Sequence, residues 1–218
     1  MNVSEAVDQR MSTRAFLDTP VPDAVLRELL IKSARAPSGG NLQPWRVFVL
    51  NGDVMRRFKA EVAASTRQEQ AAYPIYPPGL TEPYRSSRFK VGEDMYALLG
   101  IPREDRARRL ARVMENFAFF GAPAAVFCYV DRQMGPPQWS DLGMYLQTFM
   151  LLATEAGLAT CAQESWAARP QVVADFIRPP DELTIFCAVA VGHADPDAPV
   201  NRLRADRAPL DAFARFVE

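Results

Sequence analysis

The chain has 218 residues, of which 49% are hydrophobic and 23% charged, and its formal net charge is -1. This length is enough for one large domain with a substantial core. A near-neutral charge gives no electrostatic basis for binding nucleic acid or an anionic membrane, because both rely on clustered excess Lys and Arg. No apolar run approaches the roughly 18 residues of a membrane span, and the N-terminal residues lack the layout of a secretory signal. We therefore expect a cytoplasmic protein with no nucleic-acid or membrane partner.

Residues that commonly bind metals are scarce. The three cysteines, Cys128, Cys161 and Cys187, are widely spaced in apolar surroundings, where free thiols pack as small hydrophobic side chains. The single histidine, His193, ends an apolar run, and either a loop residue or a site residue fits that position. Without a CxxC or HExxH motif, we expect no metal site.

The first elements along the chain are a helix and a strand that a glycine-rich turn connects. Apolar residues on one helical face, with a proline at each end, predict an amphipathic helix at 22–35. Residues 45–50 predict a strand. Between them, residues 36–45 read Ala-Pro-Ser-Gly-Gly-Asn-Leu-Gln-Pro-Trp. The two glycines let the backbone approach a ligand closely, and Asn41 and Gln43 offer donors and acceptors, so the segment is either a ligand cradle or a simple turn.

The middle of the chain interrupts this regular pattern. Residues 73–100 contain four prolines followed by a polar, arginine-bearing stretch with weak periodicity. We interpret residues 70–112 as an excursion from the core, either a lid or an arm. Residues 103–120 predict a helix, and the apolar residues 124–130 predict a strand that suits the interior of a sheet.

The last elements are a strongly apolar helix and a strand. The helix is predicted at 141–156, with Ser140 as N-cap and Gly157 as its stop. Because it is apolar almost all round, it must be buried in the domain centre, at a subunit interface, or both. Residues 185–192 predict another core strand. With no repeat or linker in the sequence, we expect one α+β domain over residues 1–218.

Two arginine clusters are candidates for binding a phosphate. In an extended segment Arg10, Ser12 and Arg14 lie on one side, and forked guanidinium groups with a hydroxyl match phosphate oxygens. The alternative for this cluster is a solvated N-terminal arm. Three more arginines lie within residues 202–207, and the two clusters would act together only if the fold brought them together.

The segment after the apolar helix, residues 157–166, reads Gly-Leu-Ala-Thr-Cys-Ala-Gln-Glu-Ser-Trp. It is rich in small residues, and we expect a loop that presents its backbone rather than a helix or a strand. Gln163, Glu164 and the main chain around Ser165 can point at a ligand edge, although a plain connection is an equal alternative. The sequence lacks GxGxxG, GxxxxGK[ST] and GxSxG, so neither a Rossmann fold, a P-loop nor a nucleophile elbow is indicated.

In this order the segments resemble the nitroreductase family of flavin mononucleotide (FMN) enzymes over most of the chain. Residues 10–14 are similar to its phosphate-binding motif, residues 37–45 to its flavin-binding turn, and residues 157–164 to its loop at the flavin N5 atom. Residues 116–123 and 139–147 are similar to a branch that reduces nitroaromatic compounds.

Two positions depart from the family pattern. Ala162 and Ser165 stand where family members often have proline and glycine. The departures leave open which backbone group would donate to N5.

The resemblance implies an α+β sandwich with a mixed central sheet flanked by helices. It also implies an intertwined homodimer with two FMN sites built from both chains. The implied activity is reduction of nitroaromatic or quinone-type acceptors by NADPH or NADH, by ping-pong hydride transfer through flavin N5, with no catalytic side chain. Alternatives on the same scaffold are flavin fragmentation, reductive dehalogenation and non-catalytic flavin binding. The implied cofactor-binding residues are Arg10, Met11, Ser12, Arg14, Pro37, Ser38, Gly39, Asn41, Gln43, Gln163, Glu164, Ser165, Arg202 and Arg204.

Overall fold

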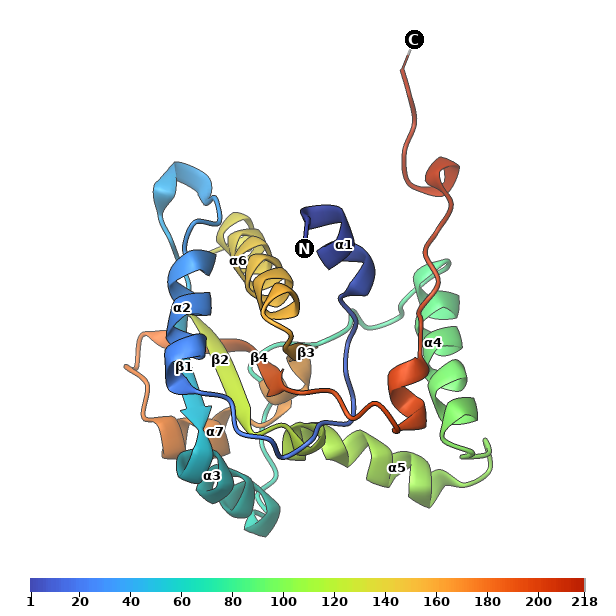
Figure 1. Ribbon diagram of the computed structural model, residues 1–218, viewed down its shortest axis with the longest axis horizontal. Coiled ribbons are helices and arrows are strands. Elements are labelled where there is room, and N and C mark those ends of the chain that lie inside the picture. Colours follow the sequence, from blue (N-terminus) through green and yellow to red (C-terminus); the bar gives the residue numbers. More distant parts are fainter. Residues whose placement is uncertain (218) are drawn as a thin grey trace.

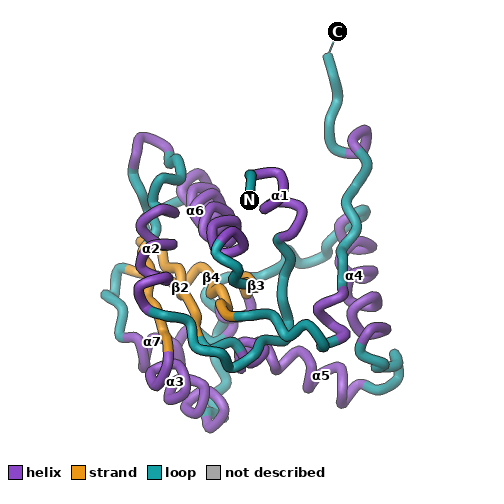
Figure 2. Tube along the Cα trace, in the orientation of Figure 1, coloured by secondary structure: helices purple, strands orange, loops and turns teal. Residues whose placement is uncertain are grey.

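A computed structural model describes residues 1–217, which form a four-stranded sheet between helices (Figure 1, Figure 2). In spatial order the strands are β1 (Arg46–Asn51), β2 (Ala124–Asp131), β4 (Leu183–Gly192) and β3 (Ala159–Gln163). All three strand pairs are antiparallel. The sheet thus differs from the mixed one that the resemblance implies. Within residues 1–217, parallel pairing is confined to the bridge between Ser12 and Thr160, because the N-terminal segment lies beside β3 too briefly to form a strand.

Helices cover both faces of the sheet. One layer consists of α2 (Asp23–Ser33) and α6 (Pro136–Glu155), and the other of α3 (Gly52–Ala64) and α7 (Pro170–Ile177). Side chains alternate between the faces along a strand. Val126 and Cys128 of β2 therefore pack with α2 and α6, whereas Phe127 packs with α3 and α7. The result is a three-layer α+β sandwich.

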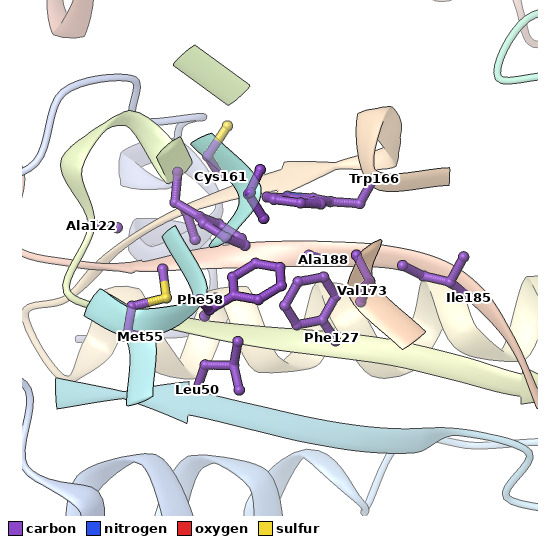
Figure 3. Packing of buried hydrophobic residues seen from close by; sticks show 14 of the residues in the cluster. Leu50, Met55, Phe58, Ala122, Phe127, Cys161, Trp166, Val173, Ile185 and Ala188 are labelled. Atoms are coloured by element: carbon purple, nitrogen blue, oxygen red, sulfur yellow. The ribbon is translucent and has the colours of Figure 1, made fainter. Parts of the chain in front are cut away.

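Aromatic rings form the centre of the core beneath α3. The ring of Trp166 stacks on that of Phe119 with 4.6 Å between their centroids, and it lies 5.4 Å from the rings of Phe58 and Phe127. Figure 3 shows Phe58 of α3 and Phe127 of β2 packed below the indole. All four side chains are fully buried. Because Trp166 follows β3 closely, this packing fixes the end of that strand.

Several predicted elements are confirmed. The helix predicted at 22–35 is α2, and the strands predicted at 45–50, 124–130 and 185–192 are β1, β2 and β4. Gly157 ends α6 with a φ of 74°. Each of these elements is marked in the sequence by an apolar run or by one apolar helical face.

The start of α6 and the nature of residues 159–163 require correction. The helix begins at Pro136 with Gly135 as its N-cap, and the Ser140 hydroxyl instead donates to the Pro137 carbonyl oxygen, 2.6 Å away. A proline suits the first helical position, where an N–H has no partner in any case. Residues 159–163 form β3 rather than a loop, because β4 offers them five paired positions.

The helix predicted at 103–120 is shorter than expected. It is α5 (Arg106–Met114), followed by a 3-10 segment, Glu115–Gly121. Phe119 and Phe120 have positive φ angles of 54° and 53°. Bulky residues rarely adopt this conformation, and the buried aromatic packing around Phe119 holds it in place.

Three helices outside the excursion were not predicted from the sequence. They are α1 (Val3–Gln9), α3 and α7. For α3 a signal existed, since its buried residues Met55, Phe58 and Val62 follow helical spacing.

The excursion consists of a proline-rich loop, α4 (Tyr84–Leu98) and α5, and these two helices stand beside the sandwich (Figure 1). No side chain of α4 is buried. Arg109 of α5 makes a two-point ion pair with Glu93 of α4, at 2.5 and 3.0 Å. None of the helices in residues 1–217 combines the length and apolar character needed to cross a membrane.

Candidate functional site

The two arginine clusters of the sequence meet at the edge of β3. The Thr13 N–H donates to the Thr160 carbonyl oxygen at 2.9 Å, which seats the N-terminal segment beside the strand. The Arg14 N–H donates to Asn201 Oδ1 at 2.9 Å, and Asn201 Nδ2 donates to the Ala15 carbonyl at 2.8 Å. Asn201 directly precedes the second cluster. The fold therefore brings the segments that carry the two clusters side by side.

A cavity of about 990 Å³ lies between this edge of the sheet and the excursion. The sheet side contributes Arg14 and the end of β3 with the residues after it, including Gln163, Glu164 and Ser165. The excursion contributes aromatic and cationic side chains from the loop before α4, from α4 and from α5. A cavity of this size, with convergent polar groups, has the dimensions of a cofactor or substrate site.

Three buried polar atoms of cavity-lining residues have no protein partner within residues 1–217: Gln163 Oε1, Ser165 Oγ and Arg112 Nε. Gln163 is 2% exposed, and its Nε2 donates to the carbonyl and side-chain oxygens of Asn116 at 2.8 and 3.2 Å. This orientation leaves Gln163 Oε1 without a donor, and Ser165 Oγ likewise has no partner. An unsatisfied buried polar atom costs about 1–3 kcal/mol. Gln163 Oε1 and Ser165 Oγ are therefore suited to a ligand that carries both donors and acceptors.

Positive charge gathers on the same wall. The Arg14 guanidinium donates to the Ser12 carbonyl at 3.2 Å and has no acidic partner among the described residues. Arg112 is buried, pairs with Glu115 and donates to the Arg14 carbonyl at 2.8 Å, and its burial lowers the pKa of its guanidinium. Burial raises the pKa of Cys161 to about 11, so this thiol is not a nucleophile at neutral pH. The wall is therefore suited to an anion.

The glycine-rich turn has an unusual backbone. Gly40, Asn41 and Gln43 have φ angles of 57°, 58° and 49°. Ser38 Oγ accepts from the Gln43 N–H at 3.0 Å, and the Gly39 N–H donates to Asp141 Oδ2 of α6 at 3.2 Å. These bonds hold the strained turn while its amide side chains stay exposed.

Within one chain this turn is separated from the cavity. It leads into β1 at one edge of the sheet, whereas Ser12 lies outside β3 at the other edge. Four strand spacings separate these positions, or about 19 Å. None of residues 37–43 is among the described residues that line the cavity. The structure thus places the predicted cofactor residues in two separate groups.

The family profile named Nitroreductase matches residues 7–193. The chain belongs to the nitroreductase family. A 4-nitrobenzoate reductase from Pseudomonas putida is 35% identical, with 97% of this chain and 93% of the relative aligned. A nitrobenzene nitroreductase from Ectopseudomonas oleovorans is 30% identical, over 99% and 96% of the two chains.

Solved structures of nitroreductases confirm the fold. The FMN and NADPH-dependent nitroreductase NfnB from Sphigopyxis sp. strain HMH is 45% identical and superposes with a TM-score of 0.96 over the whole of both chains. The FMN-dependent NfnB from Mycobacterium smegmatis, solved in complex with NADPH, is 26% identical with a TM-score of 0.92, again over both whole chains.

The remaining predicted site residues of this nitroreductase lie around the edge of β3. Arg10 and Met11 are half-buried, and the Arg10 charge is close enough to oppose the raised pKa of Cys161. Arg202 and Arg204 are exposed, and neither lines the cavity. The side chains of these two residues are therefore available to solvent or to a group bound outside the cavity.

Sequence reasoning did not predict the helix α4, which forms much of the excursion wall of this nitroreductase site. Arg85, Arg88, Phe89, Gly92, Glu93 and Tyr96 of α4 all line the cavity. Their spacing follows one helical face. Polar and aromatic residues outnumber the aliphatic Val91 and Met95 on this side of the helix, so a search for apolar periodicity overlooks it.

Proposed function

We propose that this protein is an FMN-dependent NAD(P)H oxidoreductase that reduces nitroaromatic or quinone-type acceptors. The observation that carries the proposal is the wall around Gln163, where the unsatisfied buried atoms Gln163 Oε1 and Ser165 Oγ share one cavity with Arg14, whose guanidinium has no acidic partner within residues 1–217. A flavin presents ring donors and acceptors at one end and a phosphate at the other. The family membership and the FMN and NADPH-dependent relative at 45% identity support this choice.

The residues present fit the parts of FMN. Arg10, Ser12 and Arg14 would hold the phosphate, because guanidinium forks and a hydroxyl match its oxygens. Gln163 Oε1 would accept from a ring N–H, and Ser165 Oγ would donate to a ring oxygen. Bound FMN would supply the two-electron redox chemistry.

The chain's own residues would position the bound ligands and shield them from water. Asn116 fixes the Gln163 amide so that its oxygen stays free to accept a hydrogen bond. Arg112 holds the main chain of Arg14 in place through its own hydrogen bond. Aromatic side chains of the cavity lining, among them Phe89 and Tyr96 of the excursion and Phe120 after α5, offer flat surfaces for a planar acceptor.

We further propose that a second copy of the chain completes each site. The turn at residues 37–43 lies too far from Arg14 to join it within one chain. Apolar side chains that a monomer leaves in water support an interface: Leu42 of the turn is 52% exposed, and Phe213 and Phe216 of the C-terminal segment are 71% and 83% exposed. That segment extends away from the sandwich past α4 (Figure 1). Burying such surface is the main driving force of dimer formation.

A mixing experiment tests the shared site. Arg14→Leu and Asn41→Leu each remove one group of contacts, and we expect each homodimer to retain FMN poorly. If the groups come from different chains, a mixed dimer contains one intact site and one doubly altered site. Unfolding and refolding the two variants together should then restore FMN binding to about a quarter of all sites, since half of randomly paired dimers are mixed. No restoration in a sample whose mixed dimers are verified by mass spectrometry contradicts the proposal.

The activity itself is tested with the purified protein. We expect a flavin absorbance spectrum that NADPH or NADH bleaches without oxygen, and that a nitroaromatic or a quinone then restores. A colourless protein that gains no flavin absorbance from added FMN contradicts the proposal. Bound flavin that neither dinucleotide bleaches contradicts the redox activity and favours flavin binding alone.

A further inference from the structure

The excursion wall of the cavity carries a guanidinium group with no acidic partner within residues 1–217. Arg88 lies on the cavity-facing side of α4, and its Cζ atom stands 4.0 Å from the centre of the Tyr76 ring. Tyr76 also lines the cavity, from the loop before α4. A ring beneath a guanidinium restricts the orientation of the group while leaving its N–H donors available.

Neighbouring arginines differ from Arg88 because carboxylates engage them. Arg85 pairs with Glu82 at 2.8 Å, Arg109 pairs with Glu93, and Arg112 pairs with Glu115. For Arg88 the described residues provide neither an ion pair nor a hydrogen bond within the structure. Arg14 also lacks an acidic partner among the described residues, but its guanidinium donates to the Ser12 carbonyl, and it lies on the opposite wall, where we have placed the FMN phosphate.

Glu164 is an acidic side chain of the cavity lining for which the described residues provide no ion pair. It lines the cavity and is exposed, and it belongs to the sheet wall rather than to the excursion. Each paired arginine and its carboxylate partner together carry no net charge, so the unpaired charges of the lining are those of Arg14, Arg88 and Glu164. The excursion wall thus carries a net positive charge at Arg88 in a chain whose formal net charge is -1.

We propose that Arg88, held on Tyr76, binds the anionic substituent of a ligand whose aromatic part occupies the cavity. This inference rests on the proposed function and narrows its substrate class. Forked N–H donors match a carboxylate or a phosphate monoester equally well. Two ligands of the proposed reaction can carry such a group: a nitroaromatic carboxylate as acceptor, or a dinucleotide with a 2′-phosphate as donor.

Calorimetry on the oxidised, FMN-loaded protein tests the inference without turnover. One pair of probes is 4-nitrobenzoate and its methyl ester, and the other is NADP⁺ and NAD⁺. Within each pair the two ligands differ by the anionic group, so the ratio of their affinities isolates its contribution. The variants are Arg88→Gln and Arg88→Lys. The control is Arg103→Gln, since Arg103 is exposed, lies 5.2 Å from the Phe89 ring centre and does not line the cavity.

We expect Arg88→Gln to lower one of the two ratios about tenfold, as for a lost charge-assisted hydrogen bond. Arg88→Lys should keep part of the preference, and Arg103→Gln should change neither ratio by more than about twofold. A fall in the carboxylate ratio identifies the acceptor as the anionic ligand, and a fall in the NADP⁺ ratio identifies the donor. The inference is overturned if both ratios stay within twofold in Arg88→Gln, or if the charged and neutral probes lose affinity equally.

The same measurements separate this inference from the proposed function. Wild-type protein that prefers an anionic probe through Arg88 but transfers no electrons from NADPH or NADH would refute the activity and retain the subsite. Wild-type protein that turns over, combined with unchanged affinity ratios in Arg88→Gln, would support the activity and refute the subsite.

Discussion

The sandwich and the excursion are stabilised by different means. In the sandwich, Phe58, Phe127 and Trp166 are fully buried, and β2 is buried along nearly its whole length. In the excursion, α4 buries no side chain and is held by ion pairs, such as Glu93 with Arg109 and Lys90 with Asp206. Exposed ion pairs contribute little stability compared with a buried aromatic side chain. Substitutions in the sandwich should therefore affect folding, and substitutions in the excursion should affect ligands.

The largest expected effect is the loss of the central indole. Trp166→Ala should lower the free energy of unfolding by about 3–5 kcal/mol, because it leaves a cavity among packed aromatic rings. Urea denaturation measures the change, with Trp166→Phe as a milder variant that still folds. In the excursion, Phe89→Ala should shift the unfolding free energy by less than about 0.5 kcal/mol. Equal losses in the two regions would erase the distinction between them.

The next effect concerns the Arg14 side of the site. Arg14→Leu should weaken FMN binding about 10- to 100-fold, since a charge-assisted phosphate contact is lost at a half-buried position. Flavin fluorescence measures the dissociation constant, and the melting temperature without FMN should stay close to that of the wild type. An unchanged dissociation constant would remove Arg14 from the phosphate site.

A smaller effect is expected at the turn. Asn41→Leu should weaken FMN retention about fivefold, as for one neutral hydrogen bond. Leucine also fits poorly at the φ of 58°, so Asn41→Gly provides the control that removes the amide while tolerating the backbone. Both variants should keep the native circular dichroism spectrum. Wild-type FMN affinity in Asn41→Gly would mean that the turn shapes the backbone and does not bind the cofactor through this amide.

The smallest effect is the response of the excursion to acid. The hydrogen bond from Arg109 holds the pKa of Glu93 below its ordinary value of 4.5. A carboxylate with a lowered pKa in the folded state stabilises that state above its unfolded pKa. This contribution is lost as the pH falls below 4.5 through the folded pKa. Amide exchange, corrected for its intrinsic pH dependence, should show α4 and α5 losing protection in this pH range before the strands do. Glu93→Gln should abolish this pH-dependent loss of protection in α4 and α5.

The sequence predicted best where burial imposes an apolar pattern. The continuous apolar run of β2 and the apolar face of α2 gave the correct elements, because their side chains are buried in the clusters that flank the sheet. It failed at β3, whose small residues become a strand only through pairing with β4. It also failed to predict α4, since the cavity-facing side of that helix has no reason to be apolar.

For the site, the sequence by itself determined the chemistry of the parts: arginines with a serine at residues 10–14, amides at 41 and 43, and Gln163 with its neighbours. Their order along the chain carried the family resemblance, which the family profile confirms. Only the tertiary structure decided which parts meet. Hydrogen bonds between segments distant in sequence join Arg14 to Asn201, and the strand order places the turn at the opposite sheet edge. Local residue patterns specify side-chain chemistry, whereas proximity across the fold depends on long-range packing that no short motif encodes.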